Sequence, residues 1–381
     1  MRYGALLVRS FEFATAGRIV FGCGTFAQLN GIAARFGKRP LIVTGKRPFA
    51  GVRGTRFSVA TEPTISTVRE GVAAFKEGGC DFVIAIGGGS AIDAGKAIAA
   101  AAANPGDLLD YLEVIGKGQA LESSPFPFVA VPTTAGTGSE VTRNAVLGSP
   151  EHGVKVSLRS PMMLPRVALV DPELTFGLPP AVTASTGFDA LTQSIEPYVS
   201  SRANPFTDSL CLDGIRRASE SLPRAYQNGS DANARSGMAY ASLLGGLALA
   251  NAGLGVVHGF AAPIGGMFDA PHGAVCAALL RAGMSANIAA LRERAPQSDA
   301  LERYREIARI LTKDPRATPE DGAEWVQNLT TELSIPSLTS YGIRGKDAAE
   351  LAEKASRSNS MKGNPITLTQ AELAAVIEIS L

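Results

Sequence analysis

The sequence predicts an α/β domain with a mostly parallel sheet over residues 1–180, followed by an all-α domain over residues 181–381. Before residue 180, short apolar runs alternate with segments of helical periodicity. This alternation is typical of parallel strands that are covered by helices on both faces. After residue 180, long Ala- and Leu-rich segments follow one another, separated by Gly, Pro or Asn. A chain of 381 residues is long enough to give each domain its own core.

In the first domain, five apolar runs are expected to form strands. They are PLIVTG (40–45), TRFSVA (55–60), DFVIAIGGGS (81–90), FPFVAVPTTAGTGSE (126–140) and VALVDPEL (167–174). Helices are expected over residues 65–79, where Thr64 is the candidate N-cap, and over residues 91–106, which end at Asn-Pro-Gly.

In the second domain, each Ala- and Leu-rich segment is long enough for one helix. Nine helices are therefore expected, over residues 181–200, 206–226, 231–251, 256–268, 273–291, 298–313, 319–332, 345–357 and 368–380.

Charge and composition argue against several classes of protein. Lys and Arg number 36 against 35 Asp and Glu, which gives a net charge of +1, so neither nucleic acid nor a membrane surface is an expected partner. No apolar run reaches the roughly 18 residues that a membrane span needs. The four cysteines are scattered, without metal-ligand or redox spacing. We therefore expect a cytoplasmic protein without a disulfide framework.

Three glycines, Gly87, Gly88 and Gly89, followed by Ser90, separate a predicted strand from the next helix. Without Cβ atoms the backbone can approach an anion closely, and the N–H groups at the start of a helix point at a phosphate. Together with Asp93, this turn predicts a phosphate site. The run matches neither G-x-G-x-x-G nor the Walker pattern, and a tight strand-to-helix turn is the alternative interpretation.

A second turn of small residues follows the strand at 126–140. Here Thr133, Thr134, Thr137 and Ser139 lie among glycines. Hydroxyls and bare backbone at the carboxyl ends of parallel strands suit a nucleotide that lies across the sheet edge. A threonine-capped turn fits this stretch equally well.

Two of the three histidines, His258 and His272, stand fourteen residues apart in a run of small and apolar residues, and a glycine follows each. Histidine is the commonest protein ligand of metals, although an isolated histidine is more often structural. His152, in the polar run SPEHGVK, is expected in a surface loop.

Five motifs occur together in the order typical of one known family. They are GGGSAIDAGKAIA, PTTAGTGSEVT, KVSLRSPMMLPRVALVDPEL, GFDALTQSIEPYVS and GVVHGFAAPIGGMFDAPHG. In these motifs the chain resembles the iron-containing, metal-dependent group III alcohol dehydrogenases, whose relatives include maleylacetate reductases, glycerol dehydrogenases and dehydroquinate synthases. The resemblance implies the dehydroquinate synthase-like fold, in which a Rossmann-like dinucleotide-binding domain precedes a helical metal-binding domain. The active site would lie in the cleft between them.

The resemblance also implies which residues bind NAD or NADP. The segment Gly87–Ser90 would hold the pyrophosphate. Thr133 and Thr134, with Thr137 in the same turn, would lie along the pyrophosphate and the nicotinamide. Lys155 matches a lysine that contacts the cofactor in relatives.

A metal site is implied at Asp189, Gln193, His258 and His272. Asp189 and Gln193 are four residues apart in a predicted helix, so their side chains leave the same face. Relatives that use iron usually carry a histidine where this chain has Gln193. A carboxylate, two imidazoles and an open position suit catalytic zinc, whereas Gln193 offers only a weaker carbonyl oxygen. Iron and zinc therefore both remain open.

Two further departures from the family pattern affect the predicted chemistry. Many relatives have a histidine at the position of Ala262, where it relays a proton, so the proton carrier of this chain is unassigned. Relatives often have an aspartate at the position of Gly45, where it selects NAD by repelling a 2′-phosphate. Here Gly45 precedes Lys46 and Arg47, which favours tolerance of NADP, although a surface turn with solvated charges fits as well.

We therefore predict a metal-dependent NAD(P)-linked oxidoreductase that interconverts a small-molecule alcohol and an aldehyde or ketone, with Asp189, His258 and His272 acting through the metal as a Lewis acid. One alternative is a maleylacetate reductase-like enzyme, with Arg143 and Arg159 as candidate partners of a substrate carboxylate. Others are a dehydroquinate synthase-like lyase and an inactive nucleotide-binding protein. Relatives are often dimers or larger, so a homodimer is expected.

Overall fold

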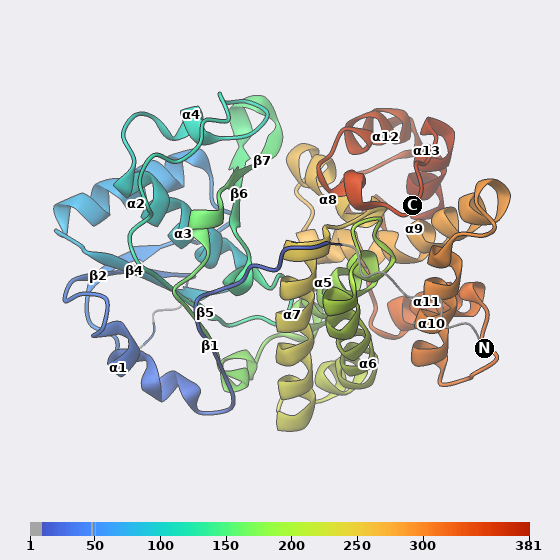
Figure 1. Ribbon diagram of the computed structural model, residues 1–381, viewed down its shortest axis with the longest axis horizontal. Helices are drawn as coiled ribbons and strands as arrows, with labels where there is room; N and C mark the ends of the chain where they lie inside the picture. Colours follow the sequence, from blue (N-terminus) through green and yellow to red (C-terminus); the bar gives the residue numbers. More distant parts are fainter. Residues whose placement is uncertain (1–9, 47–48, 50) are drawn as a thin grey trace.

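The computed structural model describes residues 10–46, 49 and 51–381. A six-stranded sheet occupies one half of the molecule, and helices make up the other half (Figure 1). The strands of the sheet are β1 (Ile19–Phe21), β2 (Pro40–Thr44), β3 (Thr55–Ser58), β4 (Phe82–Gly87), β5 (Phe128–Pro132) and β8 (Val167–Val170). Their order is β1-β8-β5-β4-β2-β3, and all neighbours are parallel. The predicted fold class is confirmed.

Helices cover both faces of this sheet because its strands are apolar on both sides. Along β2, Leu41 and Val43 pack in one cluster with α2 (Ile65–Glu77) and α3 (Gly89–Ala103). Ile42, between them, packs in a second cluster with α1 (Leu29–Ala33). The predicted N-cap of α2 is confirmed, since the Thr64 side chain accepts a hydrogen bond from the Thr67 N–H at 3.2 Å.

The first half also contains elements that the sequence did not predict. They are the three-residue edge strand β1, the short helices α1 and α4 (Leu108–Tyr111), and the antiparallel hairpin of β6 (Asn144–Ser149) and β7 (Val154–Arg159). Alternate side chains of the hairpin are buried, and Ala145 and Leu147 of β6 are fully buried. Because the two strands are short and partly polar, their alternation of apolar and polar residues is too weak to predict them from sequence. His152 lies exposed at its turn, as expected.

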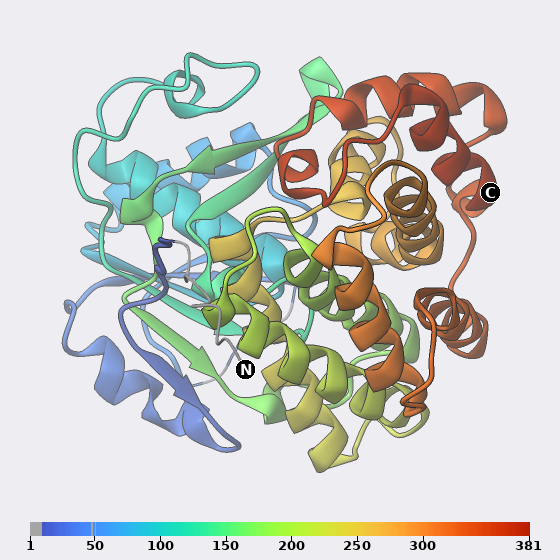
Figure 2. The ribbon, with the colours of Figure 1, turned by 45° about the vertical axis from the view of Figure 1, so that its right-hand side comes forward.

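The second half holds the nine predicted helices. They are α5 (Pro180–Val199), α6 (Pro205–Gln227), α7 (Ala232–Ala252), α8 (Val256–Met267), α9 (His272–Arg294), α10 (Asp299–Thr312), α11 (Pro319–Glu332), α12 (Ala348–Ser356) and α13 (Gln370–Ile379). The predicted start of α12 is wrong by three residues, because residues 345–347 form a 3-10 turn. The last two helices pack on α8 and α9 (Figure 2).

In the described part of the chain, one helix is long and apolar enough to cross a membrane. It is α9, and most of its apolar window is buried against other helices. The pair α7 and α8 passes the same test together but bends by 97°. These apolar stretches form the core of the helical half, where an all-round apolar surface is expected.

Candidate active site

The predicted cofactor residues come from three loops that meet at one edge of the sheet. Gly87 pairs in register with Pro132, and the Thr133 N–H donates to the Gly87 carbonyl at 2.9 Å. β2 pairs with β4 on the side opposite β5, so Gly45, which follows β2, lies at the same edge of the sheet. A Cβ on Gly87 would lie 3.4 Å from the Gly45 nitrogen. The carboxyl ends of β2, β4 and β5 therefore bring all three loops together.

The glycine turn, Gly87–Ser90, packs closely against the threonine loop, residues 133–139, and leaves little room for a side chain at Gly88 or Gly89. A Cβ on Gly88 would lie 3.3 Å from the Thr134 side chain, and one on Gly89 would lie 2.8 Å from Thr137 Cγ2. Gly88 is the N-cap of the fifteen-residue helix α3 and provides no side-chain cap. The geometry suits an anion at this helix N-terminus.

Two other predicted cofactor residues have partners within the protein. The Asp93 carboxylate accepts a hydrogen bond from the Val146 N–H at 3.0 Å and lies 3.4 Å from the Lys96 ammonium. Lys155 pairs with Glu62. Contacts of Asp93 and Lys155 with a cofactor thus stay predictions.

The surroundings of Gly45 bear on the choice of nicotinamide. A Cβ on Gly45 would meet no atom within 4 Å, so the position has room for a side chain or for a phosphate. Lys46 beside it is exposed, whereas Arg47, also expected to contact a phosphate, lies outside the described residues.

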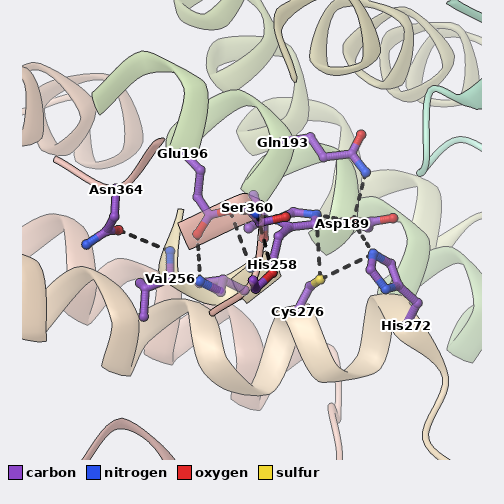
Figure 3. Close-up of polar contacts among 12 residues, drawn as sticks. Asp189, Gln193, Glu196, Val256, His258, His272, Cys276, Ser360 and Asn364 are labelled. Carbon is purple, nitrogen blue, oxygen red and sulfur yellow. Dashed lines mark hydrogen bonds and ion pairs between the residues drawn. The ribbon is translucent and has the colours of Figure 1, made fainter. Parts of the chain in front are cut away.

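The predicted metal ligands come together in the helical half, from three helices (Figure 3). Asp189 lies on α5, His258 on α8, and His272 is the first residue of α9. Asp189 Oδ1 is 3.3 Å from His258 Nε2 and 3.7 Å from His272 Nε2. Asp189 and His258 are buried, while the His272 side chain is 37% exposed, so the cluster is reached from the His272 side.

Cys276 completes this group, and sequence reasoning missed it. Its Sγ lies 3.9 Å from His258 Nε2 and 3.8 Å from His272 Nε2. The four ligand atoms of Asp189, His258, His272 and Cys276, here called the donor cluster, all lie within 4.8 Å of one another. Cys276 follows His272 by four residues on the same helix face, a spacing that the sequence contains.

Gln193 contacts the donor cluster through its amide nitrogen. Its Nε2 donates to Asp189 Oδ1 at 3.0 Å, and its Oε1 is buried without a hydrogen-bond partner (Figure 3). As placed, the amide supports the carboxylate, and only a rotated amide would turn the oxygen towards the cluster. Its predicted role as a ligand therefore stays a prediction.

Glu196 hydrogen-bonds the His258 ring at the nitrogen that faces away from the donor cluster, a role that the sequence analysis did not assign. His258 Nδ1 lies 2.6 Å from Glu196 Oε2, and the Val257 N–H donates to Glu196 Oε1 at 2.6 Å. A carboxylate accepts at Nδ1, which directs Nε2 into the donor cluster, as carboxylates do behind metal-binding histidines. Asp189, Gln193 and Glu196 follow a helical spacing of four and three residues, a signal that was available in the sequence.

The side chains of the donor cluster shift one another's pKa. Burial alone would raise the pKa of Asp189, but the neighbouring His272 and His258 rings hold that pKa below its usual value. Burial likewise opposes ionisation of the Cys276 thiol, yet the same two rings lower its pKa. A buried carboxylate and a buried thiol whose pKa is lowered, beside two imidazoles, form a donor set that fits a divalent metal ion.

The nucleotide side and the donor cluster meet at the start of α5. A Cβ on Gly136, in the threonine loop, would lie 2.8 Å from Thr186 Cβ, and a Cβ on Gly273 would overlap the Ser185 carbonyl. Thr186 is three residues before Asp189, and Gly273 directly follows His272. Close backbone contact on either side of α5 thus places the donor cluster beside the sheet edge that carries the glycine turn.

Comparison with known proteins agrees with this arrangement. Residues 16–172 match the family described as iron-containing alcohol dehydrogenase, and residues 183–381 match its C-terminal family. The chain is 39% identical to 1,3-propanediol dehydrogenase of Klebsiella pneumoniae, over 86% of this chain and 83% of that protein. It is 38% identical to alcohol dehydrogenase 4 of Schizosaccharomyces pombe, over 85% and 74%. A crystal structure of 1,3-propanediol oxidoreductase superposes with a TM-score of 0.90 at 34% identity, covering 98% of this chain and 100% of that one.

The chain therefore belongs to the iron-containing alcohol dehydrogenase family. It is an NAD(P)-linked oxidoreductase that interconverts alcohols and carbonyl compounds, as predicted. The family uses a nicotinamide cofactor and a divalent metal. Its named relatives are dehydrogenases that act on alcohols and hydroxy compounds, so the maleylacetate reductase-like and lyase alternatives are not favoured.

Proposed function

We propose that this chain transfers a hydride between a short-chain alcohol and a nicotinamide at the junction of the glycine turn, the threonine loop and the donor cluster. The observation that carries the proposal is the convergence of Asp189, His258 and His272, from three helices, beside the sheet edge. The relatives described as 1,3-propanediol dehydrogenase and as 1,3-propanediol oxidoreductase support a short-chain substrate.

In this proposal the α/β half binds and orients the cofactor. The bare backbone of Gly87–Ser90 lets the pyrophosphate approach the start of α3, where the N–H groups and the helix dipole favour negative charge. Thr133, Thr134 and Thr137 offer hydroxyls along the same edge. The nicotinamide then faces α5, the helix that carries Asp189.

Asp189, His258 and His272 would hold the metal, with Gln193 beside them. A divalent ion supplies Lewis acidity there, which stabilises negative charge on the substrate oxygen during hydride transfer. Glu196 fixes the His258 ring, so the geometry is set before substrate binds. Ala262 can neither donate nor accept a proton, so the alcohol proton leaves through water or a cofactor ribose hydroxyl.

We propose that NADP is accepted together with NAD. Gly45 removes the carboxylate that would repel a 2′-phosphate, and its surroundings are open. Lys46 adds a cation next to that space.

We further propose that the protein is a cytoplasmic homodimer. Its four cysteines are all unpaired, which suits a reducing compartment. Light scattering of the purified protein tests the oligomeric state, and a monomer would contradict it.

The experiment that tests the function joins metal analysis to NADH and NADPH consumption assays, with a panel of short aldehydes, 2-oxo aldehydes and maleylacetate, before and after chelation. We expect about one metal ion per chain, and activity with short aldehydes that chelation removes and added metal restores. A metal-free protein with full turnover would overturn the metal site. Turnover confined to maleylacetate would overturn the substrate class.

A further inference from the structure

We propose that Cys276 is a ligand of the metal, so that the donor set is one carboxylate, two imidazoles and one thiolate, and that this set selects zinc over iron. The inference rests on the proposed metal site and adds to it the fourth ligand and the identity of the ion. It assigns to Gln193, the residue in the usual fourth position, the role of supporting Asp189.

Four of the six distances among the ligand atoms of the donor cluster are compatible with a tetrahedral zinc site. A tetrahedral zinc with Zn–S of about 2.3 Å and Zn–N of about 2.0 Å separates sulfur from nitrogen by about 3.5 Å, and nitrogen from oxygen by about 3.3 Å. The two sulfur–nitrogen distances of Cys276 are 3.9 and 3.8 Å. The two nitrogen–oxygen distances of Asp189 are 3.3 and 3.7 Å. All four lie within a few tenths of an ångström of the tetrahedral values, and Figure 3 shows the sulfur between the two rings.

The position of Cys276 in the fold makes it a better ligand than Gln193. Cys276 is fully buried one turn after His272 on α9, so its Sγ and the His272 ring share one helix face. Gln193 faces the cluster with an amide nitrogen, which cannot bind a cation. Rotating the Gln193 amide would break its hydrogen bond to Asp189 and place the amide oxygen against the carboxylate oxygen, and both are acceptors. Cys276 needs no such rearrangement, because its Sγ already lies beside both imidazole rings.

The ligand types then decide the ion. Thiolate is a soft ligand that favours zinc, whereas the carboxylate and imidazoles accept iron or zinc. On binding, the Cys276 S–H bond is replaced by a bond to the metal, and the proton goes to solvent. Asp189, His258, His272 and Cys276 would then supply four ligands, a number at which zinc can still accept one more.

X-ray absorption spectroscopy on the unmodified protein loaded with zinc is the decisive measurement. We expect one sulfur at about 2.3 Å together with lighter nitrogen and oxygen neighbours. A fully loaded site with only nitrogen and oxygen neighbours would overturn the thiolate ligand and leave the proposed function intact. A protein that takes up no zinc, cobalt or iron would overturn the metal site itself, and the inference with it.

Variants loaded with Co²⁺ separate Cys276 from the other candidates. The thiolate-to-cobalt charge-transfer absorption should be present in the unmodified protein and in Gln193→Ala, and absent in Cys276→Ser. Cys23→Ser, at an exposed cysteine outside the cluster, is the matched control and should retain the band. A band that persists in Cys276→Ser would overturn the assignment of the thiolate to Cys276.

Competition between Zn²⁺ and Fe²⁺ tests the selectivity. We expect Cys276→Ser to lower the preference for zinc over iron by about tenfold or more, because a serine oxygen is a harder ligand than a thiolate. An unchanged preference would overturn the selectivity. If Cys276→Ser fails to fold, the X-ray absorption spectrum of the unmodified protein still shows whether the metal has a sulfur ligand.

Discussion

The nucleotide side and the metal side of this active site are built in opposite ways. The glycine turn and the threonine loop use the backbone, bare and closely packed, and they occupy a few consecutive residues after two neighbouring strands. The donor cluster uses side chains, and it gathers them from α5, α8 and α9, whose ligands lie up to 87 residues apart, from position 189 to position 276.

This difference teaches where each half is vulnerable. The nucleotide side depends on the absence of side-chain atoms, so adding one carbon disturbs it. The donor cluster depends on particular atoms at particular places, so removing one changes the chemistry. Variants that shift one half and leave the other intact therefore test the comparison.

Asp189→Asn should have the largest effect. The substitution keeps the side-chain volume but removes the negative charge at the centre of the cluster, which should cost the metal and lower kcat/KM by about 10³-fold or more. Metal content and steady-state rates measure this, and cofactor binding followed by fluorescence should stay near the wild-type level. Metal retained at full occupancy would contradict the role of Asp189.

Glu196→Gln should have an intermediate effect, because it acts on His258 and not on the metal. The neutral glutamine amide forms a weaker hydrogen bond with His258 Nδ1 than the carboxylate does, so we expect metal affinity to fall by about 10- to 100-fold. Titration with zinc against a chelator of known strength measures this. The exposed Glu220, exchanged to Gln, is the control and should leave the affinity unchanged. Equal affinities in all three proteins would show that Glu196 only packs the core.

Gly45→Asp tests the nucleotide side and should leave the donor cluster intact. A carboxylate there repels the 2′-phosphate of NADPH and accepts from the ribose of NADH, so we expect the ratio of kcat/KM for NADPH to that for NADH to fall by about tenfold. Gly45→Asn, which has the same shape without the charge, is the matched control. A ratio that changes equally in both variants would mean that size and not charge sets the preference.

The same contrast explains what could be predicted from sequence. β4 and β5 are near-continuous apolar runs, and the glycine turn and the threonine loop follow them directly. Local sequence pattern was therefore enough to predict the parallel sheet and the edge at which the two turns meet. For seven of the nine helices of the second half, Gly, Pro or Asn at the boundaries predicted both ends to within two residues of their positions in the structure. The hairpin of β6 and β7 was missed because its alternation is short and interrupted by polar residues.

The donor cluster was predictable only in part. Asp189, His258 and His272 were found through their resemblance to a family motif, whereas Cys276 and Glu196 were not. Each lies one helical turn from a predicted ligand, a spacing that the sequence contains, but whether such a neighbour contacts the cluster depends on how α5, α8 and α9 cross. A cysteine in an apolar helix is ordinarily a small buried hydrophobe, and only the two imidazoles beside Cys276 in space distinguish it.

The smallest expected effect concerns Glu140, which lies buried at the end of the threonine loop near Lys96. Burial raises the pKa of Glu140 to about 7 from 4.5. The folded chain therefore keeps a proton that the unfolded chain has lost, so the free energy of unfolding falls as pH rises from about 4.5 to 7. Glu140→Gln removes this dependence, because the amide does not titrate.

Urea unfolding at pH 5 and pH 8 measures the difference. Between these two values the unmodified protein should lose about 1–3 kcal/mol more stability than Glu140→Gln, the upper figure being the full linkage for this shift. Glu77→Gln, at an exposed position on α2, should follow the unmodified protein. If Glu140→Gln and the unmodified protein lose stability in parallel, Glu140 is ionised throughout. The nucleotide side would then contain a buried ion pair between Glu140 and Lys96, and it would depend on charged side chains as the donor cluster does.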